Sequence, residues 1–121
     1  MTKKEFRDKW FKTFASSLPK QVVEKYANDY IWHIFSYNLL DKDTYSEGDR
    51  ARAEFEKVNK KGAFYIDWDF DDEPNELTYD LCAPKALDKF SEIYVVGKDF
   101  EWTYIKTHEG DLCGPYFLKL K

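Results

Sequence analysis

The sequence predicts an α+β domain in which N-terminal helices pack on one face of a four- or five-stranded, mainly antiparallel sheet. Apolar residues recur at helical spacing in the first half of the chain and alternate with polar residues in the second half. Helices followed by short strands are typical of α+β domains, and short connections between strands favour antiparallel pairing. We expect one domain over residues 1–121, because two independent cores would need about twice this length.

The N-terminal half predicts helices. The first begins at a capping box, Thr2 to Glu5. Pro19 suits the first turn of a second helix. Segment 30–40 is apolar on almost all sides and favours a buried helix, although a buried strand would give a similar run. A further helix over 49–60 ends at lysines followed by Gly62, which are typical stop signals.

The C-terminal half predicts strands separated by turns. Apolar residues alternate from Phe64 to Phe70, as in a strand with one buried face. Further alternating or apolar segments lie at 77–81, 93–96, 100–107 and 116–120, with a short helix at 84–90. The row of apolar residues on one face of the first predicted helix and the alternation in the predicted strands together predict a common buried cluster. Its members are Phe6, Trp10, Phe14, Phe64, Ile66, Trp68 and Trp102.

Composition indicates a folded chain and excludes several classes of protein. Aromatic residues make up 19% of the chain and the net charge is −4, whereas disordered chains have few aromatics and high net charge. Nucleic-acid binding usually requires a basic surface. No apolar run approaches the roughly 20 residues of a membrane span, and no signal-type segment follows the N-terminus. We therefore expect a cytoplasmic protein with no nucleic-acid or membrane partner.

Three segments carry distinctive motifs: Trp32 to Ser36 (WHIFS), Trp102 to Glu109 (WTYIKTHE) and Gly114 to Phe117 (GPYF). The stretch from Glu47 to Arg52 (EGDRAR) accompanies them. In this order the motifs resemble an uncharacterised family of small bacterial proteins, a domain of unknown function, over nearly the whole chain. The resemblance implies a bacterial, cytoplasmic protein and implies no activity, substrate or catalytic residue.

The two histidines are candidates for acid–base chemistry. His33 lies in an apolar segment, and His108 lies at the end of a predicted strand beside Glu109. If the histidines met, Glu109 could orient one ring and Ser36 could lie nearby, which would make His33, His108 and Glu109 a small catalytic site. The structural alternative is a hydrogen-bonded core His33 and a turn capped around His108. In either case we expect the segment around His33 to pack against the strand that ends at Thr107.

Residues 67–80 carry seven acids and no base. Their spacing resembles the start of a Ca²⁺ loop, but Asp72 and Thr78 stand where such a loop has Gly and Glu. The acids are either the solvated surface of a strand and turn or a patch that docks a basic protein by charge complementarity. The candidate binding residues are Asp69, Asp71, Asp72 and Glu73, with Trp32, Trp102 and Tyr116 from the motif segments.

We expect no metal and no cofactor, because ligand pairs at zinc spacing and phosphate-cradling glycine loops are absent. Cys82 and Cys113 are read as buried structural thiols. Small size, acidity and aromatic richness favour a protein-binding or regulatory module of the inhibitor or immunity type. The alternative is a small hydrolase-type enzyme, which geometry would favour if both histidines lined one open pocket.

Overall fold

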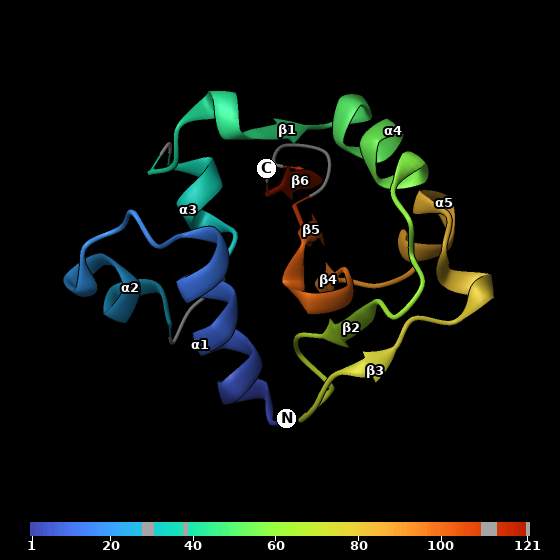
Figure 1. Ribbon diagram of the computed structural model, residues 1–121, viewed down its shortest axis with the longest axis horizontal. Coiled ribbons are helices and arrows are strands. Elements are labelled where there is room, and N and C mark those ends of the chain that lie inside the picture. The colour runs from blue at the N-terminus through green and yellow to red at the C-terminus, as the bar shows by residue number, and fades with distance from the viewer. Residues whose placement is uncertain (28–30, 38, 110–113, 121) are drawn as a thin grey trace.

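The computed structural model describes residues 1–27, 31–37, 39–109 and 114–120. Within these residues the chain forms five α-helices and one six-stranded sheet in which every described pairing is antiparallel (Figure 1). The helices are α1 (Lys3–Phe14), α2 (Lys20–Ala27), α3 (His33–Ser36), α4 (Asp49–Lys57) and α5 (Pro84–Leu87). The strands are β1 (Tyr45–Glu47), β2 (Phe64–Asp67), β3 (Asn75–Glu76), β4 (Ile93–Val96), β5 (Trp102–Lys106) and β6 (Tyr116–Lys119).

The predicted α+β class is confirmed, with more strands than expected. The strand order is β1-β6-β5-β4-β2-β3, so the two shortest strands form the edges. β1 lies in the N-terminal half, where the sequence predicts helices and no strand, and it pairs with β6 through Tyr45 opposite Leu118. Between β4 and β5 the chain reverses at Gly97, whose N–H donates to the carbonyl of Trp102 at 2.9 Å.

Helices cover both faces of the sheet (Figure 1). The expected N-terminal layer of α1, α2 and α3 lies on one face, while α4 and α5 lie on the other. All four residues of β4 are buried, since side chains on both sides of this central strand contact a helical layer or its connections. A nearly continuous apolar run is typical of strands buried on both faces.

The core consists of two clusters separated by the sheet, which corrects the prediction of one cluster. Residues predicted in the core that pack under α1–α3 are Phe6, Trp10, Phe14, Ile66 and Trp68. Trp102 belongs to the opposite cluster, where its ring stacks near Phe117 with centroids 5.9 Å apart. Phe64 is 43% exposed, because β2 lies near the edge of the sheet.

Three elements differ in extent or type from what the sequence predicts. The strand expected over 64–70 ends at Asp67, because the N–H groups of Phe70 and Asp71 donate back to the Asp67 carbonyl at 3.1 and 2.8 Å. The alternating segment at 77–81 contains a 3₁₀ turn at Tyr79–Leu81. The buried helix expected over 30–40 is helical at His33–Ser36, and Tyr30 and Asn38 lie outside the described residues.

Candidate functional site

A fully buried carboxylate, Glu92, lies directly before β4. Side chains alternate along a strand, so Glu92 shares the face of Tyr94 and Val96, which is covered by α1–α3. Glutamate is almost never fully buried unless it is paired. The sequence analysis did not single out this residue, and its burial makes it the first group to explain.

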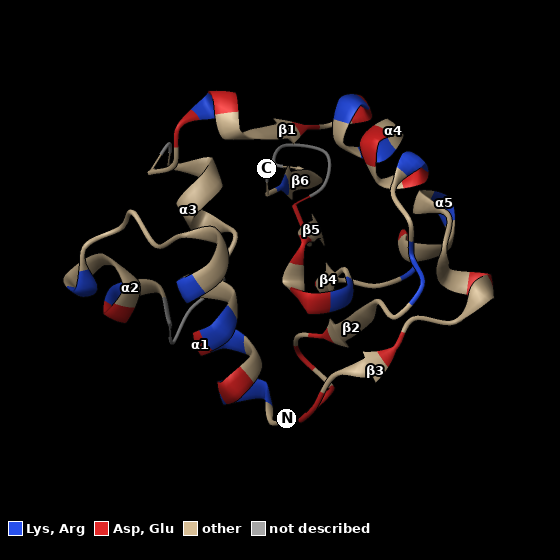
Figure 2. Ribbon diagram, in the orientation of Figure 1, with Lys and Arg blue, Asp and Glu red and all other residues tan. Residues whose placement is uncertain are grey.

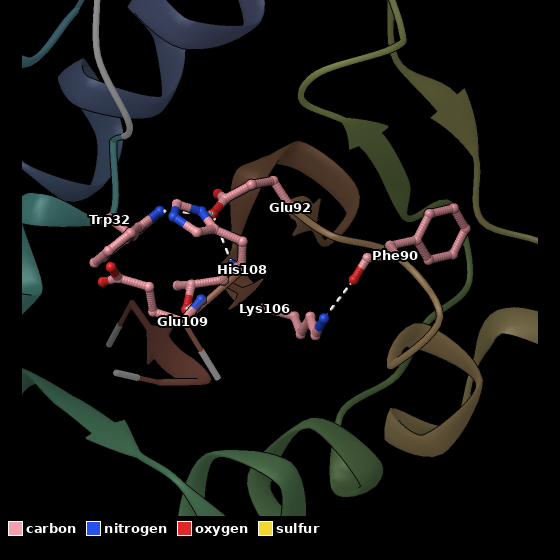
Figure 3. Close-up of polar contacts among 7 residues, drawn as sticks. Trp32, Phe90, Glu92, Lys106, His108 and Glu109 are labelled. Atoms are coloured by element: carbon pink, nitrogen blue, oxygen red, sulfur yellow. Dashed lines mark hydrogen bonds and ion pairs between the residues drawn. The ribbon is translucent and has the colours of Figure 1, made fainter. Parts of the chain in front are cut away.

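Two N–H donors and a histidine ring nitrogen, from two distant segments, meet at one oxygen of Glu92 (Figure 3). The indole Nε1 of Trp32 donates to Oε1 at 2.9 Å, and the backbone N–H of His108 donates to the same oxygen at 2.8 Å. Nδ1 of His108 also contacts this oxygen. Among the described residues, Oε2 of Glu92 is buried and has no hydrogen-bond partner.

The environment of Glu92 acts on its acidity in two opposed ways. Burial raises the pKa of Glu92 above its ordinary value, because a buried charge loses its hydration. The hydrogen bonds from His108 and Trp32 act in the opposite direction, since they favour the carboxylate, and burial is the larger effect. The charged form of Glu92 therefore depends on these two partners.

His108 joins this buried carboxylate to the surface. Its side chain is 36% exposed, whereas that of Glu92 is fully buried. The carboxylate in contact with Nδ1 is thus Glu92, while the candidate Glu109 is exposed and donates its backbone N–H to Thr107 Oγ1 at 3.2 Å. That bond caps the turn after β5, as the structural alternative expected.

Trp32 brings the two histidines to one region. Its ring centroid lies 4.3 Å from that of His33 and 5.7 Å from that of His108. The expected contact between the His33 segment and the end of β5 is confirmed through this ring. His33 in turn stacks on Tyr37, with centroids 5.1 Å apart and nearly parallel planes.

A second candidate region is the acidic turn, defined as residues 67–76 between and including the ends of β2 and β3 (Figure 2). Asp69, Asp72 and Glu73 are exposed, and Phe70 between them is 79% exposed. Asp71 differs from the other acids because its Oδ2 accepts from the Asp67 N–H at 3.0 Å and from Asn75 Nδ2 at 2.9 Å.

The acidic turn is fastened to the start of α1. The backbone N–H of Lys3 donates to the carbonyl of Asp72 at 2.8 Å, and the Lys3 ammonium group bonds the carbonyl of Trp68. The same ammonium group lies 4.4 Å from the centroid of the Trp68 ring. Figure 1 shows the N-terminus beside this connection. The acidic turn is therefore held in place by Lys3, which bonds carbonyls within the turn, as well as by the two strands at its ends.

A pocket of about 480 Å³ adjoins the acidic turn. Its lining includes apolar Met1, Phe64 and Phe100 and turn residues Glu73 and Pro74. Phe100 has a positive φ of 55°, which is an outlier for a bulky residue. Its ring is held 5.5 Å from that of Phe6, so packing in the core maintains this conformation.

The family model described as a domain of unknown function (DUF4275) matches residues 2–117. The chain belongs to this family. No curated protein and no solved structure matches the chain. The resemblance to a domain of unknown function over nearly the whole chain is thereby confirmed for this DUF4275 protein.

Three motif residues of this DUF4275 protein are core residues. Trp32, Trp102 and Tyr116 are 1%, 2% and 1% exposed, so their rings offer no surface to a partner. This corrects the expectation that they belong to a binding surface. The motif tryptophans instead support the fold from opposite faces of the sheet.

The described residues of this DUF4275 protein hold neither a metal-binding cluster nor a membrane-spanning helix. In the described ranges, no group of three or more His, Cys, Asp or Glu side chains could hold a metal ion. Across the same residues, no helix is long and apolar enough to cross a membrane. Cys82 is a free, partly exposed thiol instead of a buried one, and Cys113 lies outside the described residues.

Proposed function

We propose that this protein is a protein-binding module that docks a basic partner through the acidic turn. The observation that carries the proposal is Phe70, an aromatic side chain 79% exposed among exposed carboxylates. Binding energy at protein interfaces is concentrated in a few anchors, often aromatic, surrounded by weaker contacts that exclude water. Phe70 would serve as such an anchor, and the surrounding Asp69, Asp72 and Glu73 would form the charged rim of the interface.

The turn is organised before any partner arrives. Asp71 bonds two groups within the turn, and Lys3 of α1 binds two of its carbonyls. A preorganised surface loses less conformational entropy on binding, which leaves more of the contact energy for affinity. The adjoining pocket at Phe64 offers apolar surface for a neighbouring side chain of the partner.

The sign of the charge selects the partner. Seven acids without a base in residues 67–80 attract a basic surface and speed its approach. Exposed charges are screened beyond about 8 Å at physiological ionic strength, so binding should weaken as salt rises. A small acidic module that covers a basic surface would regulate its partner by occlusion, as inhibitors and immunity-type proteins do.

The test measures the affinity for a purified partner, obtained by capture on the immobilised protein at low salt. A charge variant removes the exposed acids but keeps Asp71, whose carboxylate holds the turn together. We expect this variant to bind at least about tenfold more weakly, and Phe70→Ser to lose a similar factor, as for an interface anchor. The substitutions in the charge variant are Asp69→Asn, Asp72→Asn, Glu73→Gln and Glu76→Gln.

A matched control removes the same number of negative charges from exposed positions elsewhere. If net charge alone governed binding, the control and the charge variant would weaken it equally, and the turn would lose its assigned role. Unchanged affinity in the charge variant would also contradict the proposal. The control substitutions are Asp8→Asn, Glu24→Gln, Glu56→Gln and Glu101→Gln.

A further inference from the structure

The Glu92–His108 pair has a geometry that the proposed binding function does not use. We propose that it is an acid–base pair in which His108 activates water to hydrolyse an aryl ester and Glu92 positions the imidazole. The pair lies beside the buried indole of Trp32 and combines a fully buried carboxylate with a partly exposed ring.

Glu92 fixes the orientation and the tautomer of His108. Its Oε1 contacts Nδ1 of the ring and also accepts the backbone N–H of the same residue at 2.8 Å. A ring nitrogen that faces a carboxylate carries the proton, which leaves the lone pair on Nε2. A base oriented by a third group in this way is the recurring arrangement of acyl-transfer sites.

Trp32 fixes Glu92 in turn. Its indole N–H reaches the same carboxylate oxygen at 2.9 Å from a segment 60 residues earlier in the chain. The carboxylate is therefore held from two directions, and its burial strengthens its attraction for a positive charge on the neighbouring ring.

The proposed step balances with water as the only co-reactant. Nε2 of His108 removes a proton from water while the water oxygen forms a bond to the acyl carbon of the ester. The resulting imidazolium is stabilised by Glu92, which stays a carboxylate. The proton then passes to the leaving oxygen as the carbon–oxygen bond breaks. The products are a carboxylic acid and a phenol, and His108 returns to its neutral form.

The surroundings indicate the class of substrate. Tyr37 is 57% exposed, and its ring stacks on His33, which in turn lies 4.3 Å from Trp32 by ring centroids. Trp32 itself is buried, but the exposed Tyr37 and the partly exposed His33 present aromatic surface beside the place where Trp32 contacts His108. Planar aromatic groups stack on such exposed rings favourably, so an ester with an aryl group fits the region.

The test follows hydrolysis of p-nitrophenyl acetate by the full chain. General base catalysis contributes about 10²–10⁴ in rate, so we expect His108→Gln to lose at least about a hundredfold relative to wild type. Glu92→Gln should lower kcat and leave KM nearly unchanged, because Glu92 acts through His108 and does not touch the ester. Imidazole also hydrolyses this ester without protein, so its rate alone is subtracted. Added imidazole should then raise hydrolysis by His108→Gly above that rate, which a purely structural role for the ring would not allow.

Glu109→Gln is the matched control, because it removes an exposed carboxylate one residue from His108. We expect its rate to equal that of the wild type. Circular dichroism of each variant checks that it folds, and if Glu92→Gln does not, the His108→Gly rescue still decides. A wild-type rate no higher than that of folded His108→Gln would overturn the proposal. Loss of activity in Glu109→Gln with full activity in Glu92→Gln would overturn the role of Glu92.

Discussion

The hydrogen bond between Trp10 and Thr103 joins α1 to the middle of the sheet, and a double-mutant cycle can measure its energy. Trp10 is fully buried, and its Nε1 donates to Thr103 Oγ1 at 2.9 Å. The Thr103 hydroxyl donates onward to the carbonyl of Val95 at 2.9 Å. Both groups are out of reach of water, so neither can replace a lost partner by solvent.

The two single substitutions have different expected costs. Trp10→Phe keeps an aromatic ring near Phe14 and Phe35, and should cost about 1–2 kcal/mol through the lost hydrogen bond and part of the buried surface. Thr103→Val leaves the indole N–H buried without its acceptor, which should cost about 1–3 kcal/mol. For comparison, Trp10→Ala should cost about 3–5 kcal/mol, because it empties a large core site.

The double variant removes both partners, so no buried donor is left over. Its cost should be smaller than the sum of the single costs by about 1 kcal/mol. The lost bond to Val95 occurs in Thr103→Val and in the double variant, and so cancels in the cycle. Urea unfolding followed by far-ultraviolet circular dichroism measures each free energy without relying on Trp10 fluorescence. Strict additivity would show that this bond carries no energy and refute the reasoning.

Three further substitutions test separate parts of the structure by thermal and urea unfolding. Gly97→Ala should cost about 1–3 kcal/mol, because its Cβ would lie 2.3 Å from the indole nitrogen of Trp102, and a stability equal to wild type would refute this packing. Arg52→Gln should cost about 0.2–1 kcal/mol at neutral pH, because Arg52 forms two hydrogen bonds with the half-exposed Asp88. Arg52 lowers the pKa of Asp88 in the folded protein, so this difference should shrink as pH falls from about 4, the ordinary value of an aspartate, through the lower pKa of the folded Asp88. Phe70→Ser should change stability by less than about 0.5 kcal/mol, because Phe70 is 79% exposed.

Local sequence patterns predicted the helices and strands better than they predicted which of these elements pack together. The capping box at Thr2 and the stripe through Phe6, Trp10 and Phe14 lie where the sequence predicts them, since both depend on neighbouring residues of one helix. The alternating pattern correctly places Trp102 and Thr103 on opposite faces of the sheet. It does not reveal which of the two faces each side chain occupies. The apolar run of β4 carries the signal that both faces are covered, and this signal would have predicted two clusters.

The candidate site was only half visible in the sequence. His33 and His108 stand out because histidine is rare in this chain. The sequence predicted that the His33 segment packs against the end of β5, but it did not predict that Trp32 contacts both histidine rings. Glu92 is one of 23 acidic residues, and nothing near it in sequence reveals that its partners lie 60 and 16 residues away. Its one local signal is its place in the alternating pattern, because residues two apart in a strand share a face and Glu92 therefore lies on the same buried face as Tyr94 and Val96.

The two proposed sites are linked by backbone but separable by side chain. The N–H of Trp68, at the start of the acidic turn's reversal, donates to the carbonyl of Glu92 at 3.0 Å. This bond uses no atom of the Glu92 carboxylate, so Glu92→Gln should preserve it and leave the acidic turn in place. The variant should therefore bind a basic partner as the wild type does while it loses ester hydrolysis. Conversely, the charge variant of the turn should hydrolyse the ester normally, because none of its four substituted residues contacts Glu92 or His108 among the described residues. If either variant impaired both functions, the two regions would form one site, and the separate assignments made from their geometry would be wrong.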